Sequence, residues 1–422
     1  MPRCIISIVS GYGEIGGNCV KIMDSNRGLL FDQGIRFSVF RRYFSRLFEP
    51  RGIIQLRSIR IIPPLDTYDE VSELYISHFH LDHLGLLHAV PRDIKIYVPS
   101  LEILKLMCRH YEKSTTWLAY VPPRYDADIR KAEPIKGRDI VPVQVRHSSY
   151  PSFAYIYFGS EKTILYTGDL RVEPLLPKSM DKEIHPITLL DYLEENKDIK
   201  IDTLIIEGTN FGRINTPIDG FMAQKMLAKI IDPHKTALLI VDPGDIELLI
   251  LVLMSLAETK KKPILASKKL VDMTEHWAQH TQLIDTDQIC TLAETIEEAT
   301  TLEIVGEKDV KKHPEKYAIL TDLATIDETL HTIGEETPRG APAILLIPEP
   351  LDESSLQNEK TLQNWLQHYH YLTYRIRISG HYHPHQLKRI LRTIKPKEII
   401  PIHTTKPKMI KDIHSAYILR IK

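Results

Sequence analysis

The stretch Ser77-His78-Phe79-His80-Leu81-Asp82-His83 decides how this sequence is interpreted. It places four side chains that can bind a metal, three imidazoles and one carboxylate, within six residues. The apolar run before it, Leu74–Ile76, predicts a strand, so the four side chains belong to a loop at a strand end. Four such donors are costly to bury without an ion, because each one needs its own polar partner. Imidazole together with carboxylate suits zinc or a similar transition metal.

Three further candidate ligands, His147, Asp169 and His403, each come shortly after another apolar run. Strands that end at one edge of a sheet can bring the residues that follow them together. With the first stretch, these residues give five histidines and two aspartates, which is enough for two ions. The full set is His78, His80, Asp82, His83, His147, Asp169 and His403.

The composition is that of an ordinary folded protein. The chain has 422 residues, is 43% hydrophobic and carries a net charge of −1. These values exclude extended disorder and give no overall basic field that would attract nucleic acid. At about 150 residues per domain, the length predicts two or three domains, or one large core with an insertion. The four cysteines form no CxxC pair, so they indicate neither a zinc finger nor a redox dithiol, and they fit a reducing compartment.

No stretch predicts export or insertion into a membrane. The N-terminus lacks an apolar run of signal-peptide length. The most apolar window, Ile246 to Ala257, is interrupted by Glu247 and Ser255 and is too short to cross a bilayer. We therefore expect a cytoplasmic protein without membrane contact.

The near-neutral total conceals two basic segments. Residues 36–60 hold seven arginines against one glutamate (+6), and residues 375–422 hold twelve lysines and arginines against two acids (+10), which leaves −17 for the rest. In the first segment, aromatic residues are interleaved with the arginines, among them Arg41 and Arg42. This pattern suits phosphate contact and base stacking, and it fits equally well an amphipathic helix with its rings toward the core. We expect the second segment to form a basic surface.

The first third of the chain predicts β structure, and the part after about residue 210 predicts alternating helices and strands, which is typical of βαβ units. A hairpin is predicted from Asn18–Asp24 and Gly28–Asp32, because a turn-forming segment separates two apolar runs. The other predicted strands are Cys4–Val9, Leu74–Ser77, Ile94–Val98, Val141–Val145, Phe153–Phe158, Thr163–Tyr166, Ala237–Val241, Pro263–Ala266, Tyr317–Leu320, Ala343–Ile347, Arg375–Ile378 and Glu398–Ile402. The predicted helices are Pro99–Glu112, Asp219–Ile231, Asp245–Ala257, Leu292–Thr300, Ser354–Tyr369 and Gln386–Ile394.

The segment Gly11-Tyr-Gly13-Glu-Ile-Gly16 matches the letter pattern GxGxxG, and Asp32 follows at about the distance of the dinucleotide-binding motif. That motif works only where a helix begins at the glycines, because the helix N-terminus holds the pyrophosphate. Here the glycines lead into the predicted hairpin. We therefore expect a glycine-rich loop beside an active site and no Rossmann fold.

The order HxHxDH, a distant histidine, TGD and a histidine after the last strand resembles the metallo-β-lactamase superfamily. The resemblance implies an α/β fold, an αββα sandwich, with two zinc ions. The implied ligands of one ion are His78, His80 and His147. Those of the other ion are Asp82, His83 and His403. Asp169 would bridge the two.

Three later motifs resemble the β-CASP subfamily, nucleases that include ribonuclease J and the cleavage and polyadenylation specificity factor nuclease. The motifs are Glu207-Gly208-Thr209, Ser379-Gly380-His381 and Pro401-Ile402-His403. The resemblance implies a metallo-β-lactamase domain in two parts, 1–209 and 373–422, with an α/β β-CASP domain, 210–372, inserted between them. A final histidine is associated in that family with RNA substrates. The implied function is a zinc-dependent ribonuclease that cleaves RNA from the 5′ end, internally, or in both ways.

The resemblance also implies roles for side chains around the ions. Two ions can activate a water molecule and hold the phosphate oxygens for in-line attack, with Asp82 orienting the nucleophile. His381 is the candidate general acid for the leaving 3′ oxygen, Glu207 would keep it protonated, and His383 is an alternative acid. Asp32 is expected either to support a ligand or to form a structural turn. The expected substrate contacts are Ser379 and Gly380 of the second motif and Arg41 and Arg42 of the basic segment.

Two departures from ribonuclease J concern the 5′ end of the substrate. Tyr382-His383-Pro384 follows the second motif, where ribonuclease J has small residues that help to seat a 5′ phosphate, and Thr404-Thr405 follows the last histidine in place of Gly-Glu. The sequence therefore leaves the mode of cleavage open. It also leaves open a hydrolase of another phosphodiester or small substrate, and a non-catalytic RNA-binding β-CASP subunit. RNA is the expected partner, and a homodimer is an open alternative to a monomer.

Overall fold

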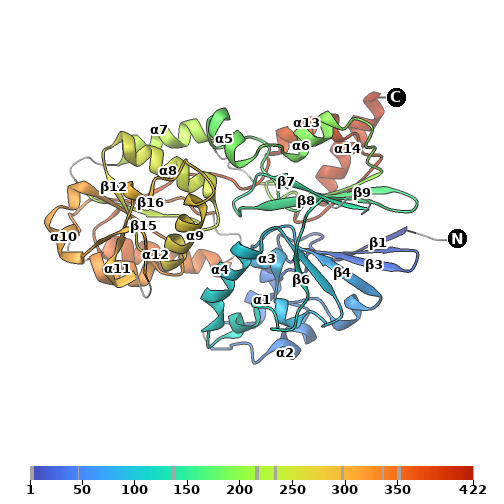
Figure 1. The fold of residues 1–422 in the computed structure, drawn as a ribbon, viewed down its shortest axis with the longest axis horizontal. Coiled ribbons are helices and arrows are strands. Elements are labelled where there is room, and N and C mark those ends of the chain that lie inside the picture. The colour runs from blue at the N-terminus through green and yellow to red at the C-terminus, as the bar shows by residue number, and fades with distance from the viewer. Residues whose placement is uncertain are drawn as a thin grey trace. The chain divides into compact units, whose positions relative to one another are not determined.

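The computed structural model describes residues 4–45, 47–134, 139–213, 218–231, 235–295, 299–334, 337–348 and 353–421. The chain forms two compact units. The first unit combines Met1–Val172, Ile187–Ile214 and Gly380–Lys422, and the second combines Glu173–Pro186 and Asn215–Ser379. Both units contain sheets and helices (Figure 1), so the predicted α/β class is confirmed.

The first unit contains a six-stranded sheet with the order β1-β2-β3-β4-β5-β6. Its strands are β1 (Cys4–Ser10), β2 (Cys19–Asp24), β3 (Arg27–Phe31), β4 (Val71–Tyr75), β5 (Lys95–Val98) and β6 (Ile129–Lys131). The antiparallel strands β2 and β3 form the predicted hairpin, in which Asp24 pairs with Arg27 and Ser25 adopts a left-handed backbone conformation in the tight turn. From β3 to β6, neighbouring strands run parallel.

A five-stranded sheet in the same unit has the order β18-β10-β9-β8-β7. Its strands are β7 (Ile140–Val145), β8 (Ser152–Phe158), β9 (Thr163–Tyr166), β10 (Thr203–Ile206) and β18 (Glu398–Pro401). The neighbours β9, β10 and β18 are parallel. Because β7 and β9 both pair antiparallel with β8, they run in the same direction. Four of the five strands therefore end at one edge of this sheet.

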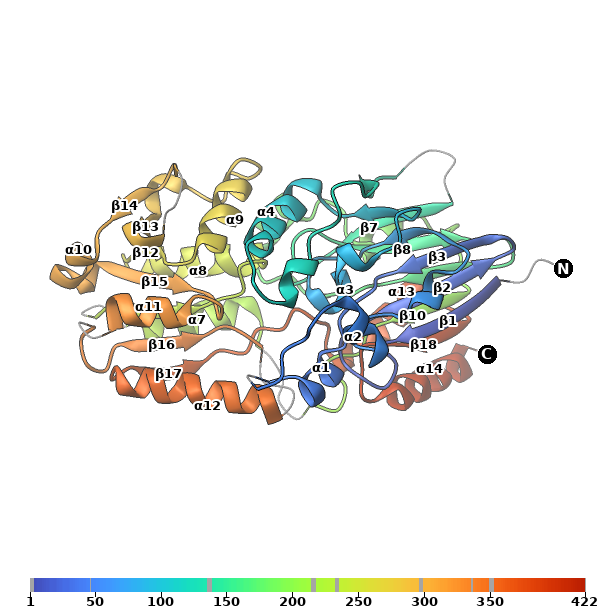
Figure 2. The same cartoon turned by 90° about the horizontal axis from the view of Figure 1, so that it is seen from below.

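The two sheets of the first unit pack face to face. Side chains from both sheets form one buried core, in which the rings of Phe31 and Tyr166 stack with centroids 5.3 Å apart. The other face of the five-stranded sheet is covered by α6 (Leu189–Glu195), α13 (Leu387–Ile394) and α14 (Pro407–Ile421). On the outer side of the six-stranded sheet lie α1 (Phe37–Tyr43) and α2 (Ile53–Ser58), as Figures 1 and 2 show. The remaining helices of this unit are α3 (Leu81–Leu84) and α4 (Leu101–Glu112).

The second unit is built on a parallel seven-stranded sheet with the order β14-β13-β12-β15-β11-β16-β17. Its strands are β11 (Ala237–Ile240), β12 (Lys262–Leu265), β13 (Cys290–Leu292), β14 (Glu303–Val305), β15 (Tyr317–Thr321), β16 (Pro342–Leu345) and β17 (Leu372–Arg375). Its helices are α5 (Lys178–Ile184), α7 (Gly220–Ile230), α8 (Ile246–Glu258), α9 (Lys268–Ala278), α10 (Glu307–Lys312), α11 (Ile326–Ile333) and α12 (Glu353–His368). Figure 1 shows α7 and α8 on one side of this sheet and α11 and α12 on the other.

The most apolar window of the sequence lies in α8, which has 13 residues and buries most of its side chains. Among the helices of the described residues, none combines the length and the apolar character that crossing a bilayer requires.

Two predicted elements are wrong because strand pairing overrides the local pattern. At the predicted helix Leu292–Thr300, Leu292 ends β13, which is held between β12 and β14, and Ala293–Thr295 form a single 3-10 turn. Residues 296–298 of that prediction lie outside the described residues. The strand predicted at Arg375–Ile378 lies three residues earlier, because Leu372–Arg375 pairs with β16.

The limits of the two units depart from the predicted domain boundaries 209/210 and 372/373. Residues 173–186 belong to the second unit, where Glu247 of α8 accepts the N–H of Leu175 at 3.0 Å and faces His185 Nε2 at 3.1 Å. Residues 210–214 belong to the first unit, and residues 373–379 to the second, where the chain continues from β17. The family identity of each domain stays a prediction.

In the basic segment at residues 36–60, α1 has no buried residue, so the rings of this helix do not face the core, and contact of the segment with nucleic acid stays a prediction. Arg41 and Arg42 are exposed near the end of α1. Phe40, on the same helix, packs against Trp117, with ring centroids 4.9 Å apart. Arg46 lies outside the described residues.

A tight backbone contact holds the HxHxDH stretch against the region around the hairpin. The N–H of Asn18 donates to the carbonyl of Asp82 at 2.9 Å, and the N–H of Gly34 donates to the carbonyl of Asn18 at 2.8 Å. A Cβ atom at position 34 would lie 1.7 Å from the Asp82 carbonyl oxygen. Only glycine therefore allows this approach.

We expect Gly34→Ala to displace this loop and to lower the free energy of unfolding by about 1–3 kcal/mol, because backbone atoms must move to make room. Thermal unfolding followed by circular dichroism measures the effect. Gly306→Ala is the matched control, since the nearest atom to its added Cβ is Asp309 Oδ2 at 3.7 Å. Equal melting temperatures for the two variants would contradict the contact.

Candidate metal centre

The candidate site lies where strands of both sheets of the first unit end. β4 leads into Ser77–His83, and β7, β9, β10 and β18 lead into His147, Asp169, Glu207 and His403. The last four strands point the same way, which is why the residues that follow them meet at one edge. All of these residues belong to the first unit.

Asp169 lies at the centre of the site. Its Oδ2 is 3.2 Å from His83 Nε2, 3.7 Å from His403 Nε2, 3.8 Å from His147 Nε2 and 3.9 Å from His78 Nε2. The side chain is 2% exposed, and its Oδ1 makes no hydrogen bond to any described residue. Four imidazole nitrogens from three separate loops thus converge on one buried carboxylate.

The other nitrogen of each of these rings faces an oxygen behind it. The partners of Nδ1 are Asp32 Oδ2 for His83 (2.7 Å), the Gly380 carbonyl for His147 (2.7 Å), Thr209 Oγ1 for His403 (2.7 Å) and Ser77 Oγ for His78 (3.0 Å). A ring that donates through Nδ1 can present the Nε2 lone pair to a metal. These four oxygen atoms therefore orient the rings so that Nε2 of each ring faces the centre of the site, as metal binding needs.

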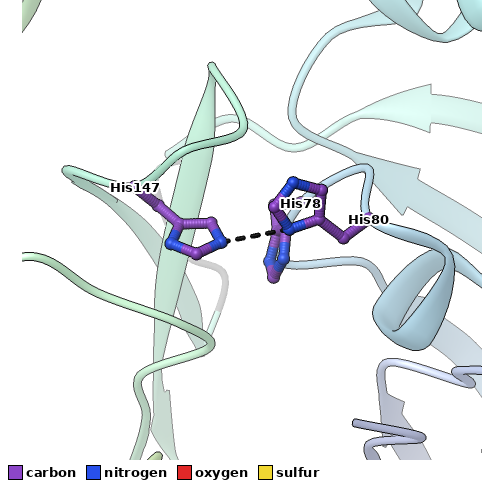
Figure 3. A group of neighbouring side chains, drawn as sticks. All are labelled: His78, His80 and His147. Atoms are coloured by element: carbon purple, nitrogen blue, oxygen red, sulfur yellow. Dashed lines mark hydrogen bonds between the residues drawn. The ribbon is translucent and has the colours of Figure 1, made fainter. Parts of the chain in front are cut away.

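The first expected ligand group is formed by His78, His80 and His147, whose ligand atoms lie within 4.8 Å of one another. Figure 3 shows that the three rings face one another, with His147 coming from the end of β7 and the other two from the loop after β4. His147 Nε2 lies 3.2 Å from His80 Nδ1.

The second expected group is formed by Asp82, His83 and His403, whose ligand atoms also lie within 4.8 Å of one another. His403 Nε2 is 3.1 Å from Asp82 Oδ2. Because Asp169 Oδ2 lies 3.9 Å or less from a histidine of each group, this oxygen is shared between the two groups.

The donor set fits transition-metal ions. Ligand atoms about 2.0–2.2 Å from a tetrahedral zinc lie about 3.3 Å apart, and the separations given above run from 3.1 to 3.9 Å. His78 Nε2 and Asp169 Oδ1 are buried and make no hydrogen bond within the described part of the chain. A bound cation would remove the cost of burying these atoms.

The charges of the site favour the forms that bind a cation. Burial raises the pKa of Asp169, but the imidazoles of His403 and His83 outweigh it and hold this pKa well below its usual value. Burial lowers the pKa of His83, but the carboxylate of Asp169 raises it well above the usual value. Burial keeps the pKa values of His78 and His147 well below the usual value, so these two rings are neutral. An ion that displaces the proton of His83 would meet an ionised carboxylate and two neutral imidazoles.

Glu207 and His381 form a polar pair beside the second group. Glu207 is fully buried, and its Oε1 lies 3.3 Å from His381 Nδ1. His381 Nδ1 is also 3.8 Å from Asp169 Oδ2, and the side chain is 19% exposed. His381 thus lies between a buried carboxylate and the centre of the site, with part of its ring accessible. The ring of His383, the alternative acid, stacks on that of His385, with centroids 5.6 Å apart.

The predicted substrate contacts lie at two places in the chain, at Ser379 and Gly380 and at Arg41 and Arg42. Gly380 lies against His147, since a Cβ atom at position 380 would be 3.1 Å from His147 Cε1. Ser379 is the last residue of the second unit. Arg41 and Arg42 lie on α1. Contact of these four residues with a substrate stays a prediction.

Asp32 forms a structural turn and also contacts His83, a candidate ligand. It adopts a left-handed backbone conformation (φ 57°) directly after β3, and its carboxylate accepts the N–H and the Oγ–H of Ser77, both at 2.7 Å. The same carboxylate binds His83 and the hydroxyl of Tyr166. Ser77 and Tyr166 were not among the predicted site residues, although each lies directly beside a metal motif, and the same is true of Thr209 beside Glu207.

The glycine-rich loop at residues 11–17 borders the site, as expected. The carbonyl of Gly11 accepts the N–H of His403 at 2.7 Å, and a Cβ atom at Gly16 would lie 2.7 Å from Asp82 Oδ2. The loop leads into strand β2 and not into a helix, so it lacks the geometry of a dinucleotide site.

We expect Asp32→Asn to weaken zinc binding by about 10–100-fold, because an amide cannot replace a carboxylate that accepts hydrogen bonds from three side chains and orients His83. Competition with a chromogenic chelator measures the affinity. Asp24→Asn is the matched control, since Asp24 likewise accepts hydrogen bonds from a tyrosine and a serine, Tyr157 and Ser160. Unchanged affinity in Asp32→Asn would show that the carboxylate does not support the ligand.

Comparison with known proteins finds distant relatives. No protein-family model matches the chain. A protein of Methanocaldococcus jannaschii described as a probable RNase MJ4 is 26% identical over 219 residues, which cover 46% of this chain and 43% of that protein. Ribonuclease J of Mycobacterium tuberculosis is 23% identical over 215 residues, which cover 49% of this chain and 34% of that protein. The similar region thus spans less than half of each relative.

A crystal structure of a protein of unknown function from Enterococcus faecalis is similar over 96% of this chain and 95% of its own, with a TM-score of 0.70 and 18% sequence identity. At this identity the likeness concerns the fold alone. About half of this chain is thus weakly similar to proteins named as ribonucleases, and its fold as a whole is similar to that of another protein.

Proposed function

We propose that this chain is a zinc-dependent ribonuclease of the metallo-β-lactamase superfamily and its β-CASP branch. The observation that carries the proposal is the convergence of four histidine Nε2 atoms on Asp169, in the two groups that the sequence motifs imply. The similarity of about half of the chain to proteins named as ribonucleases supports RNA as the substrate.

The arrangement of layers supports the proposed family. Two sheets pack face to face in the first unit, with helices on their outer faces, as an αββα sandwich requires. The second unit, with its parallel sheet, is inserted into the sequence of the first. We assign the first unit to the metallo-β-lactamase domain and the second to the β-CASP domain.

The seven candidate ligands would hold two zinc ions. His78, His80 and His147 would hold one, Asp82, His83 and His403 the other, and Asp169 would be shared. When bound, such ions polarise a phosphate oxygen and make water a competent nucleophile at neutral pH.

Asp82 would orient the attacking water. Burial raises the pKa of its carboxyl, but the hydrogen bond from His403 and the charge of His83 hold this pKa well below its usual value. The carboxylate is therefore ionised and can accept a hydrogen bond from water.

His381 would complete the reaction as a general acid. As the oxygen of the attacking water, which loses one proton to solvent, bonds to phosphorus, the bond from phosphorus to the 3′ oxygen breaks. This oxygen takes a proton from the imidazolium of His381, and the ring takes up a proton from solvent before the next turnover. Glu207, 3.3 Å from His381 Nδ1 and fully buried, would stabilise the protonated ring. The exposed part of the ring would let it reach the substrate.

A second candidate function, a non-catalytic RNA-binding subunit, would be favoured by missing ligands, and here all seven are present. A hydrolase of a small phosphodiester shares the same ligand set. Comparing the cleavage of labelled RNA with that of a small chromogenic phosphodiester separates it from the proposal.

We expect Asp82→Ala to abolish RNA cleavage while RNA binding is largely retained, because the change removes a ligand and the group that orients water. A digestion time course on RNA with 5′ monophosphate, triphosphate or hydroxyl ends, with the products sized, measures cleavage and distinguishes exonuclease from endonuclease action. Asp128→Ala is the control, since Asp128 pairs with Arg130 at the surface. Undiminished cleavage by Asp82→Ala would defeat the proposal.

We expect His381→Ala to slow single-turnover RNA cleavage by about 10²–10⁴-fold while the zinc content stays unchanged, because only the proton donor is removed. His383→Ala is the matched comparison from the same stretch. A larger loss in His383→Ala than in His381→Ala would reassign the acid.

A further inference from the structure

An exposed aromatic side chain is braced beside the candidate metal centre. Tyr12 follows Gly11, whose carbonyl accepts the N–H of His403, and it pairs with Thr404 in a short parallel bridge. From within the loop, Glu14 Oε1 accepts the N–H of Gly11 at 3.3 Å. The loop backbone is therefore fixed against a candidate metal ligand, while the side chain of Tyr12 remains 50% exposed.

Two lysines accompany this ring. The ammonium of Lys411 lies 5.4 Å from the centroid of the Tyr12 ring, within the range of a cation–π contact. Lys406, two residues after Thr404, runs its side chain along Gly212, where a Cβ atom would come within 2.8 Å of it. Both lysines are exposed, so their charges are available to an anion from solution.

Helix stability does not explain these lysines. Lys406 lies just before the start of α14 and Lys411 follows in its second turn, and the first turn of this helix contains no acidic residue. The start of a helix carries partial positive charge, so Lys406 is unfavourable for the helix itself, and the effect fades within the first turn, before Lys411. Their position is favourable for a negatively charged ligand that passes Tyr12.

We propose that Tyr12, Lys411 and Lys406 form a binding site for single-stranded RNA beside His403, in which a base stacks on the ring of Tyr12 and the neighbouring phosphates contact the two lysines. A positive groove with an aromatic platform is how proteins hold single strands without reading their sequence. The site rests on the proposed function and extends it, because it gives the substrate strand a fixed position next to the candidate metal centre.

The test measures the binding of RNA and the cleavage of RNA separately. Binding of a fluorescent single-stranded RNA is followed by anisotropy with EDTA present, and KM and kcat are measured on the same RNA with zinc. We expect Tyr12→Ala to raise both the dissociation constant and KM by about tenfold, with kcat at saturating RNA within about twofold, as loss of one stacked base predicts. Tyr12→Phe keeps the ring and should bind like the unchanged protein.

The control is Tyr125→Ala, since Tyr125 is a 99% exposed tyrosine of the same unit. Lys411→Ala should reduce the slope of the logarithm of the binding constant against the logarithm of the salt concentration by about one, because one phosphate contact is lost. The site would be overturned if Tyr12→Ala and Tyr125→Ala bound single-stranded RNA equally well. It would also be overturned if Tyr12→Ala weakened the binding of duplex RNA as much as that of single-stranded RNA. If the unchanged protein binds RNA through Tyr12 but does not cleave it, the proposed function fails and the binding site stands.

Discussion

A single buried carboxylate organises the first unit: Asp169, with four imidazole nitrogens of other loops facing one of its oxygens. A buried carboxylate is costly unless positively charged groups lie next to it. Protons can supply part of that charge, and metal ions can supply it together with Lewis acidity. Metal ions held beside Asp169 would supply the chemistry of the proposed hydrolytic function.

The rest of the fold serves to hold these atoms in place. Parallel strands that end at one edge deliver Asp169, Glu207 and His403, and backbone contacts that only glycine permits fix the HxHxDH loop. Asp32 joins the two halves of this scaffold, because its carboxylate binds His83 on one loop and Tyr166 at the end of a strand in the other sheet. The geometry of the site is therefore inseparable from the packing of the two sheets.

Local patterns in the sequence predict much of this arrangement, since each candidate ligand follows a short apolar run and the hairpin has a clear turn. Features that depend on distant pairing are not visible locally. Cys290–Leu292 becomes a strand through its two neighbours, and residues 173–186 join the second unit through Glu247. The carbonyl of Gly380 orients His147 across 233 residues, a contact that no motif announces.

The most direct test of the central claim is the number and position of zinc ions per chain, measured by elemental analysis and by anomalous diffraction at the zinc edge. The account predicts two ions per chain, both adjacent to Asp169. A chain without zinc after purification in its presence, or with zinc bound away from Asp169, would contradict it.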